Sequence, residues 1–213
     1  MRQATIPPPR GTYRHGDLRR ALLEAGIELA RAGGPEAVTL REATRRAGVA
    51  PNAAYRHFSS QQDLLQAVRA AALSAIAVSM ETELSAIGPG LSPADFAKAS
   101  LRAVGTGYLG YARLEPGLFR TAFGTAARPD RTLSAEQVGR SGLDPFQLLS
   151  LALDRMQAAC VLPPDRRAGA EYLAWSAVHG LAMLVIDGPL RVMDDQQVTA
   201  LVPRLLEMVE KGL

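Results

Sequence analysis

The chain has a single cysteine, Cys160, and this excludes an intrachain disulfide. A protein that folds without disulfides suits a reducing cytoplasm. No run of about 18 apolar residues occurs, and the first residues, MRQATIPPPRGTYR, lack the apolar segment of a secretory signal. We therefore expect a cytoplasmic protein that does not span a membrane. Because Cys160 lies among apolar residues, we expect it to be a small buried side chain.

The motifs of common enzyme and metal-binding classes are also missing. The three histidines, His15, His57 and His179, are too far apart in the sequence to show the ligand spacing of a zinc site. No phosphate-binding glycine loop and no serine-hydrolase motif is present. The sequence therefore predicts neither an enzyme nor a protein that needs a metal or another cofactor.

Lysine is scarce, since Lys98 and Lys211 are the only lysines among 24 basic residues. The positive charge is concentrated at the N-terminal end. Residues 1–60 carry ten arginines against five acidic residues, a net charge of +5, whereas residues 61–213 carry a net charge of −2. A basic N-terminal part on a slightly acidic remainder indicates that the N-terminal part contacts a polyanion.

No segment shows the two-residue alternation of a strand, so we predict an all-α chain of about nine helices. Residues 1–13 contain three consecutive prolines and are typical of a disordered arm. Capping residues and helix-breaking glycines and prolines divide the remainder. The expected helices span about residues 17–33, 39–47, 51–58, 61–86, 93–114, 116–123, 145–160, 165–186 and 195–211, with a mobile connection at 124–143.

Two helix starts carry the sequence pattern of a capping box, Thr39 with Glu42 and Ser60 with Asp63. At the other end of the chain, Pro203 falls inside the last expected helix. Because proline lacks an N–H and clashes with the preceding turn, we expect it to kink that helix or to mark its true start.

Residues 39–58 have the pattern of a helix-turn-helix, in which a short helix, a turn at Gly48 and a second short helix follow one another. We expect a left-handed backbone at Gly48, and we expect Ala54 and Phe58 to face inward. Asn52, Tyr55 and Arg56 then face outward, where Asn52 suits adenine and Arg56 suits guanine or phosphate. Tyr55 and His57 suit phosphate oxygens, and Pro51 and Ala53 flank the same face.

Residues 14–65 resemble the DNA-binding domain of the TetR family of bacterial transcription regulators. The resemblance is carried, in order, by Leu22–Gly26, Gly34, Val38–Glu42, Arg46–Val49, Tyr55–Phe58 and Asp63–Leu65. It implies a three-helix DNA-binding head at 14–60 on a helical-bundle body at 61–213 that binds an effector and dimerises, with helix 61–86 connecting them. Together with the helix-turn-helix pattern, the resemblance gives the expected DNA-binding residues, which are Thr39, Arg41, Pro51, Asn52, Ala53, Tyr55, Arg56, His57 and Gln61.

Three positions depart from the family pattern. Gln61 replaces a lysine that would touch phosphate, although backbone N–H groups at a helix start can still bind phosphate. We therefore expect weaker non-specific DNA binding rather than its loss. Ala43 replaces the common isoleucine, and Ala50 is a poor N-cap, which costs about 1 kcal/mol.

The body resembles one TetR subgroup through Trp175–Gly180, which fits a Trp-x-x-x-His-Gly signature, and through Tyr111-Ala112, Pro116 and Phe119. Helix 165–186 is apolar on two faces and so needs two partners. Pairing with the last helix across a two-fold axis would form a four-helix bundle, as in the family, and would place two recognition helices about one DNA turn apart. The expected interface residues are Trp175, Val178, Ala182, Leu201 and Leu205.

The resemblance also implies a pocket for a small molecule. Its candidate residues are apolar or aromatic and favour a hydrophobic effector, but each also suits a plain core. They are Met80, Tyr108, Tyr111, Phe119, Phe123, Met156 and Met183. The glycines at 105, 107 and 110 either let helices approach closely or leave room for a ligand.

The sequence thus predicts a homodimeric transcriptional regulator, a repressor that a small hydrophobic effector releases from a palindromic DNA operator. The alternative is a helical small-molecule-binding protein without effective DNA binding, an interpretation that Gln61 and Ala50 motivate. Titration with DNA distinguishes the two.

Overall fold

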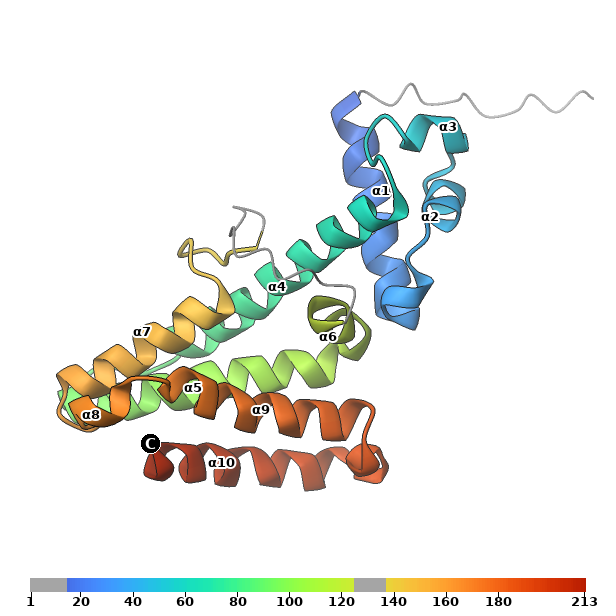
Figure 1. The fold of residues 1–213 in the computed structure, drawn as a ribbon. Helices are drawn as coiled ribbons and strands as arrows, with labels where there is room; N and C mark the ends of the chain where they lie inside the picture. Colours follow the sequence, from blue (N-terminus) through green and yellow to red (C-terminus); the bar gives the residue numbers. More distant parts are fainter. Residues whose placement is uncertain (1–14, 125–136) are drawn as a thin grey trace, which may run out of the picture.

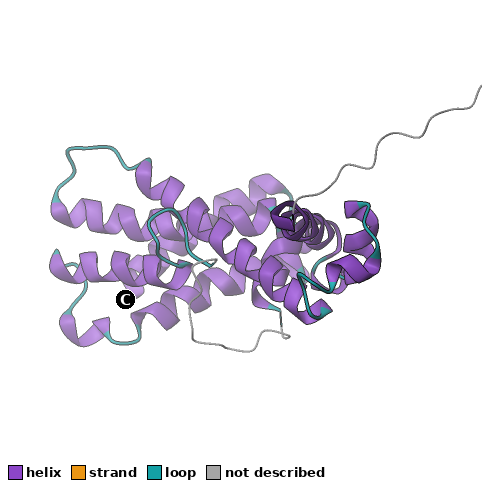
Figure 2. Cartoon of the chain, turned by 90° about the horizontal axis from the view of Figure 1, so that it is seen from above, coloured by secondary structure: helices purple, strands orange, loops and turns teal. Residues whose placement is uncertain are grey.

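The computed structural model describes residues 15–124 and 137–213. The arm expected at 1–13 and most of the connection expected at 124–143 lie outside these residues. All regular structure in the described ranges is helical, which confirms the all-α class (Figures 1 and 2). The α-helices are α1 (His15–Gly33), α2 (Leu40–Ala47), α3 (Pro51–Ala54), α4 (Gln61–Ser85), α5 (Pro93–Leu114), α6 (Pro116–Phe123), α7 (Pro145–Ala158), α8 (Pro164–Arg167), α9 (Ala170–Ile186) and α10 (Asp195–Gly212), with 3-10 helices η1 (Pro35–Ala37) and η2 (Pro189–Val192).

Helices α1, α2 and α3 form a small head at one end of the molecule, and the long helix α4 runs from this head into the body (Figure 1). In the body, α5 packs against α4, α7, α9 and α10, so it is the central helix. The short helix α6 packs on both α1 and α4 and therefore joins the body to the head.

The N-caps behave as their sequences predict, with one difference. The hydroxyl of Thr39 accepts from the backbone N–H of Glu42 at 3.2 Å, and the hydroxyl of Ser60 accepts from that of Asp63 at 3.1 Å. The second hydrogen bond of each predicted capping box, from the N-cap N–H back to the acidic side chain, does not form. The Asp63 carboxylate accepts from the N–H of Ser59, one residue before the N-cap, and the Glu42 carboxylate turns toward arginines of its own helix.

Ten α-helices in the described residues replace the expected nine, because the single helix expected at 165–186 is divided. Gly169 lies between α8 and α9 with φ of 81°, a left-handed conformation that interrupts helical hydrogen bonding. Pro203 lies well inside α10, so it does not mark the start of that helix. The buried position expected for Cys160 is also wrong: the helix ends at Ala158, and Cys160 is exposed in the following turn with φ of 56°.

The glycines of α5 have different roles. A Cβ on Gly107 would lie 2.6 Å from the Cα of Met80, so this glycine lets α4 and α5 pack backbone to backbone. A Cβ on Gly105 would overlap the side chain of Leu206 on α10. Gly110 faces open space among the described residues. Close approach of neighbouring helices thus explains the glycines at positions 105 and 107 but not the one at 110.

Helix α4 is the one helix in the described part of the chain that is long and apolar enough to cross a membrane by length and composition alone. Its apolar residues, including Leu64, Val68 and Ile76, pack in the protein core. Burial against other helices therefore accounts for its composition.

Candidate nucleic-acid interface and effector cavity

The turn between α2 and α3 has the geometry of a helix-turn-helix. Gly48 adopts φ of 68° and ψ of 29°, the predicted left-handed conformation, and its N–H bonds back to the carbonyl of Arg45 at 3.3 Å. Ala43, Ala54 and Phe58 are fully buried. These three side chains fix α3 against the rest of the head.

Helix α3 is shorter than expected, because Tyr55–His57 follow it as a turn rather than as further helix. Pro51, Asn52 and Arg56 are nevertheless exposed, and Tyr55 is 59% exposed despite its aromatic ring. Ala53 and His57 are partly buried. The surface of α3 and its turn therefore offers an amide, a phenol and a guanidinium to solvent.

The other predicted DNA-binding residues border this surface. Arg41 on α2 and Gln61 at the start of α4 are exposed. Thr39 is partly buried, and its hydroxyl is already used as the N-cap of α2. The structure thus places the predicted residues on one small domain, around the turn and the two helix starts.

Glu42 lies among the arginines of α2 and neutralises part of their charge. Its carboxylate lies 2.6 Å from Nη2 of Arg45 and 3.5 Å from Nε of Arg46. Hydrogen bonding from Arg45 lowers the pKa of Glu42 to about 2, so the carboxylate is charged at neutral pH. The sequence pattern predicts Glu42 only as a capping-box partner of Thr39 and not as a partner of these arginines.

In the body, the polar atoms of Trp175, Tyr108 and His179 form a short hydrogen-bonded chain, called the relay below, among aromatic rings. The Trp175 indole N–H donates to the Tyr108 hydroxyl oxygen at 3.0 Å, and that oxygen lies 2.8 Å from Nδ1 of His179. Burial lowers the pKa of His179 and raises that of Tyr108. Since indole can only donate, the Tyr108 oxygen is the acceptor of the Trp175 bond, and the same hydroxyl is also the hydrogen-bond partner of His179.

A cavity of about 230 Å³ lies next to this relay, between α4, α5, α6, α7, α9 and α10. Of the predicted effector residues, Met80, Tyr108 and Phe123 line it. Tyr111, Phe119 and Met156 are buried in the core, Met183 is partly buried against it, and none of these four lines the cavity. The remaining wall consists of Arg69, Leu73, Leu101, Val104, Gly105, Gln137, Asp144, Pro145, Phe146, Leu149, Ala174, Trp175, Val178, Leu206 and Val209.

Three of the expected dimer residues face the interior of the chain itself. Trp175 and Val178 line the cavity, and Ala182 is 3% exposed. Leu201 and Leu205 of α10 are partly exposed. On α9 the exposed residues are instead Tyr172 (64%), Leu173 (65%), Ser176 and Leu184 (43%), and Gly180 is partly exposed between them.

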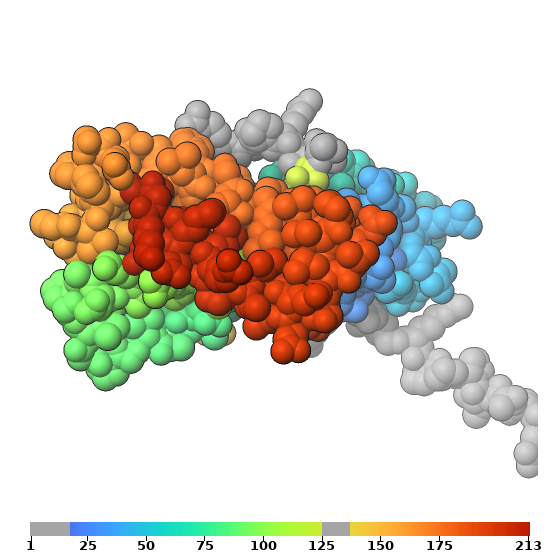
Figure 3. All heavy atoms as spheres, turned by 90° about the horizontal axis from the view of Figure 1, so that it is seen from below, coloured from blue at the N-terminus to red at the C-terminus, as the bar shows by residue number. Residues whose placement is uncertain are grey.

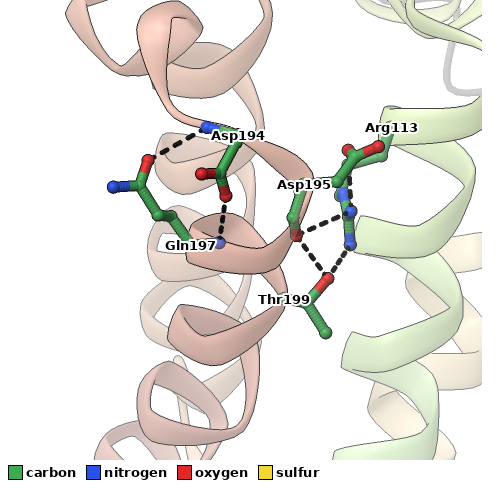
Figure 4. A network of polar contacts seen from close by, with 5 residues as sticks. All are labelled: Arg113, Asp194, Asp195, Gln197 and Thr199. Atoms are coloured by element: carbon green, nitrogen blue, oxygen red, sulfur yellow. Dashed lines mark hydrogen bonds and ion pairs between the residues drawn. The ribbon is translucent and has the colours of Figure 1, made fainter.

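Helices α9 and α10 occupy one side of the body, and Figure 3 looks onto that side. The start of α10 is tied to α5, because the Arg113 guanidinium donates to Thr199 Oγ1 and Asp195 Oδ1, each at 3.0 Å (Figure 4). Asp194 and Gln197 form a complete capping box at the same helix start. These contacts fix the position of α10 beside the central helix.

A helix-turn-helix head on an all-α body defines the class of DNA-binding transcriptional regulators. Residues 22–68 match the family described as bacterial regulatory proteins, tetR family. Residues 101–209 match the family described as tetracyclin repressor-like, C-terminal domain. The chain belongs to the TetR family, as its N-terminal motifs predict, and it is a DNA-binding transcriptional regulator.

Solved structures share the fold over nearly the whole chain. A protein of unknown function from Rhodococcus sp. RHA1 is 24% identical with a TM-score of 0.74, covering 96% of this chain and 99% of the other. The TetR family transcriptional regulator PfmR from Thermus thermophilus is 19% identical with a TM-score of 0.58, covering 90% and 95%. A tetR family regulatory protein from Rhodococcus RHA1 is 18% identical with a TM-score of 0.56, covering 90% and 96%. No curated protein matches the chain in sequence.

Proposed function

We propose that the protein is a cytoplasmic, dimeric repressor that a small hydrophobic effector releases from a palindromic operator. In this proposal residues 14–60 bind DNA, residues 61–213 bind the effector and dimerise, and α4 connects the two parts. The observation that carries the proposal is the largely apolar cavity beside helices that lead to the helix-turn-helix head.

The exposed groups of the head suit the major groove of DNA. Asn52 can form a paired hydrogen bond with adenine, and Arg56 can bond guanine or phosphate. Arg41, Tyr55 and the backbone N–H groups at the start of α4 suit phosphate oxygens, which fix docking without reading sequence. Gln61 supplies no cation there, so non-specific affinity is expected to be modest.

The lining of the cavity favours a neutral apolar or aromatic effector. Most of its side chains are aliphatic or aromatic, and the polar atoms of Tyr108 and Trp175 are bonded to each other. A charged ligand would lose its hydration in such a site, whereas an apolar ligand gains from burial.

Helix α6 provides a route from the cavity to the head. Phe123 at its end lines the cavity, and at its start a Cβ on Gly117 would overlap the carbonyl of Ala30 on α1. Arg31 of α1 also donates to Glu115, just before α6, at 2.8 Å. An effector that displaces Phe123 would therefore move α6 against both α1 and α4, tilt α4 and change the spacing of the two heads in a dimer. Structures of the dimer with and without an effector that releases DNA, if they showed the same distance between the two heads, would contradict this mechanism.

Replacing an exposed head residue tests DNA recognition directly. Tyr55→Ala should weaken binding to a selected palindromic duplex, measured by fluorescence anisotropy, and should leave dimerisation unchanged. Leu114→Ala is the control, because Leu114 is 79% exposed but lies in the body at the end of α5. Equal affinity of the Tyr55 variant and the unchanged protein would remove this residue from the interface.

The same titration addresses the alternative function. A regulator should bind DNA with a steep dependence on salt, because counterions leave the phosphates. A chain that binds the effector but shows no salt-dependent DNA binding would be a helical small-molecule-binding protein instead.

A further inference from the structure

The segment Gln137–Leu143, called the strap here, leads into α7 and lies along α4. Gln137 at its first position and Asp144 immediately after it both line the cavity. Within it, the N–H of Gly139 donates to the carbonyl of Leu143 at 2.8 Å, and Leu143 packs against the core. The two ends of the strap therefore lie at the wall of the cavity, and the segment leads directly into α7 (Figure 1).

Two side chains of α4 hold the strap. The hydroxyl of Ser74 donates to the carbonyl of Val138 at 2.7 Å. The carboxylate of Glu81 accepts from the N–H groups of Arg140 and Ser141, each at 2.8 Å, and from the Ser141 hydroxyl at 2.5 Å. Three donors on one carboxylate form a strong contact, because hydrogen bonds to an ionised acceptor are about twice as strong as neutral ones.

The strap is shaped to approach this carboxylate closely. A Cβ on Gly139 would lie 2.5 Å from Oε1 of Glu81, so a larger residue would push the Glu81 side chain away. The backbone of Gly139 lies outside the left-handed region, and alanine is therefore compatible with its conformation. Glycine is required here by the contact and not by the turn.

We propose that Glu81 is a latch that holds the strap between two residues of the cavity wall, Gln137 and Asp144, and so controls how fast the effector enters and leaves. This inference rests on the proposed effector cavity. Burial opposes the charge of Glu81, but the bonds from Ser141 and Arg140 outweigh it and hold the pKa of the carboxyl below its usual value, so the latch is formed at neutral pH. Because the latch is on α4, it also joins the rim of the cavity to the helix that carries the head.

The proposal predicts a change in binding rates with little change in affinity. The neutral fluorophore N-phenyl-1-naphthylamine serves as probe, and stopped-flow fluorescence gives its association and dissociation rates. In Glu81→Ala and in Gly139→Ala both rates should rise at least about tenfold, because the loss of a single charge-assisted hydrogen bond already corresponds to that factor. Glu83→Ala, on the same helix, is the control, and Ala174→Leu, which fills the cavity, should abolish binding of the probe.

Amide hydrogen exchange tests the latch without a ligand. The amides of Arg140 and Ser141 should exchange about tenfold faster in both latch variants and unchanged in the control. Unchanged exchange would overturn the latch. Faster exchange with unchanged probe rates would overturn its role in access. If the unchanged protein bound no probe, the effector cavity would fail, and the exchange data would still report separately on the contact between Glu81 and the strap.

Discussion

At the scale of single residues, the charge that the head presents to DNA depends on Glu42 as well as on its arginines. Its carboxylate holds Arg45 and Arg46, so neither guanidinium is fully available to a phosphate. The helix cap at Thr39 uses the backbone N–H of Glu42 and not its side chain. The charge can therefore be removed without removing that cap.

Glu42→Gln should strengthen DNA binding and make it more dependent on salt. If one or two arginines are released to phosphates, the slope of log affinity against log salt should steepen by roughly 0.9 to 1.8. Anisotropy titrations at several salt concentrations measure this slope. Glu36→Gln, an equal change of charge at a site in η1, is the control. Identical slopes in the two variants would mean that only overall charge matters.

The relay in the body gives a second residue-scale prediction. Tyr108→Phe removes the acceptor of the Trp175 N–H and the hydrogen-bond partner of His179 Nδ1. Leaving such groups unpaired should lower the free energy of unfolding by about 1–3 kcal/mol. Tyr111→Phe is the control, because the Tyr111 hydroxyl is buried without a partner among the described residues and its removal should not destabilise the protein. Urea denaturation compares the two, and equal stability losses would contradict the assignment.

At the scale of helices, the sequence predicts where a helix begins better than where it ends or which helices it packs against. Thr39, Ser60, Ser92 and Asp144 each accept a bond from the N–H three residues later, and this signal lies wholly within one turn. The break at Gly169 is also local, but the apolar positions of this helix begin only at Tyr172, so their periodicity does not show the break.

The cavity could be predicted only in part, because its wall is assembled from six helices. Met80, Tyr108 and Phe123 were identified by their apolar character. Arg69 and Asp144 were not, since their positions on the wall depend on how α4 and α7 pack. In contrast, the inward and outward faces of the helix-turn-helix follow from spacing within twenty residues.

Two glycines of α5 allow an element-scale test of helix packing. Gly107→Ala should destabilise the protein, because its Cβ would overlap the backbone of Met80 and force α4 and α5 apart. Such overpacking costs about 1–3 kcal/mol or more. Gly110→Ala meets open space and should be stabilising by up to about 1 kcal/mol, the difference in helix propensity. Thermal unfolding of both variants should show shifts of opposite sign, and a stable Gly107 variant would show that the helices can separate freely.

At the scale of the whole molecule, the proposed recognition of an operator would depend on two heads held at a fixed distance. The proposed dimer would use the outward face of α9, where Leu173 and Leu184 flank Gly180. A small residue between two large apolar ones lets a second helix pack closely. The residues first expected there, Val178 and Ala182, are already buried within the chain. The second apolar face of α9 is therefore defined by Leu173 and Leu184.

Leu173→Glu should convert a dimer into monomers. Burying an unpaired charge costs about 3–5 kcal/mol, and two-fold symmetry would place it on both copies. Analytical ultracentrifugation measures the mass, and anisotropy measures affinity for a duplex with two half-sites. Because a monomer engages only one half-site at a time, affinity should fall by roughly 10²-fold. Leu114→Glu is the control, because Leu114 is 79% exposed at the end of α5 and is not part of the α9 face. If the Leu173 variant stayed dimeric and kept its affinity, the interface would have to lie on another face of the body.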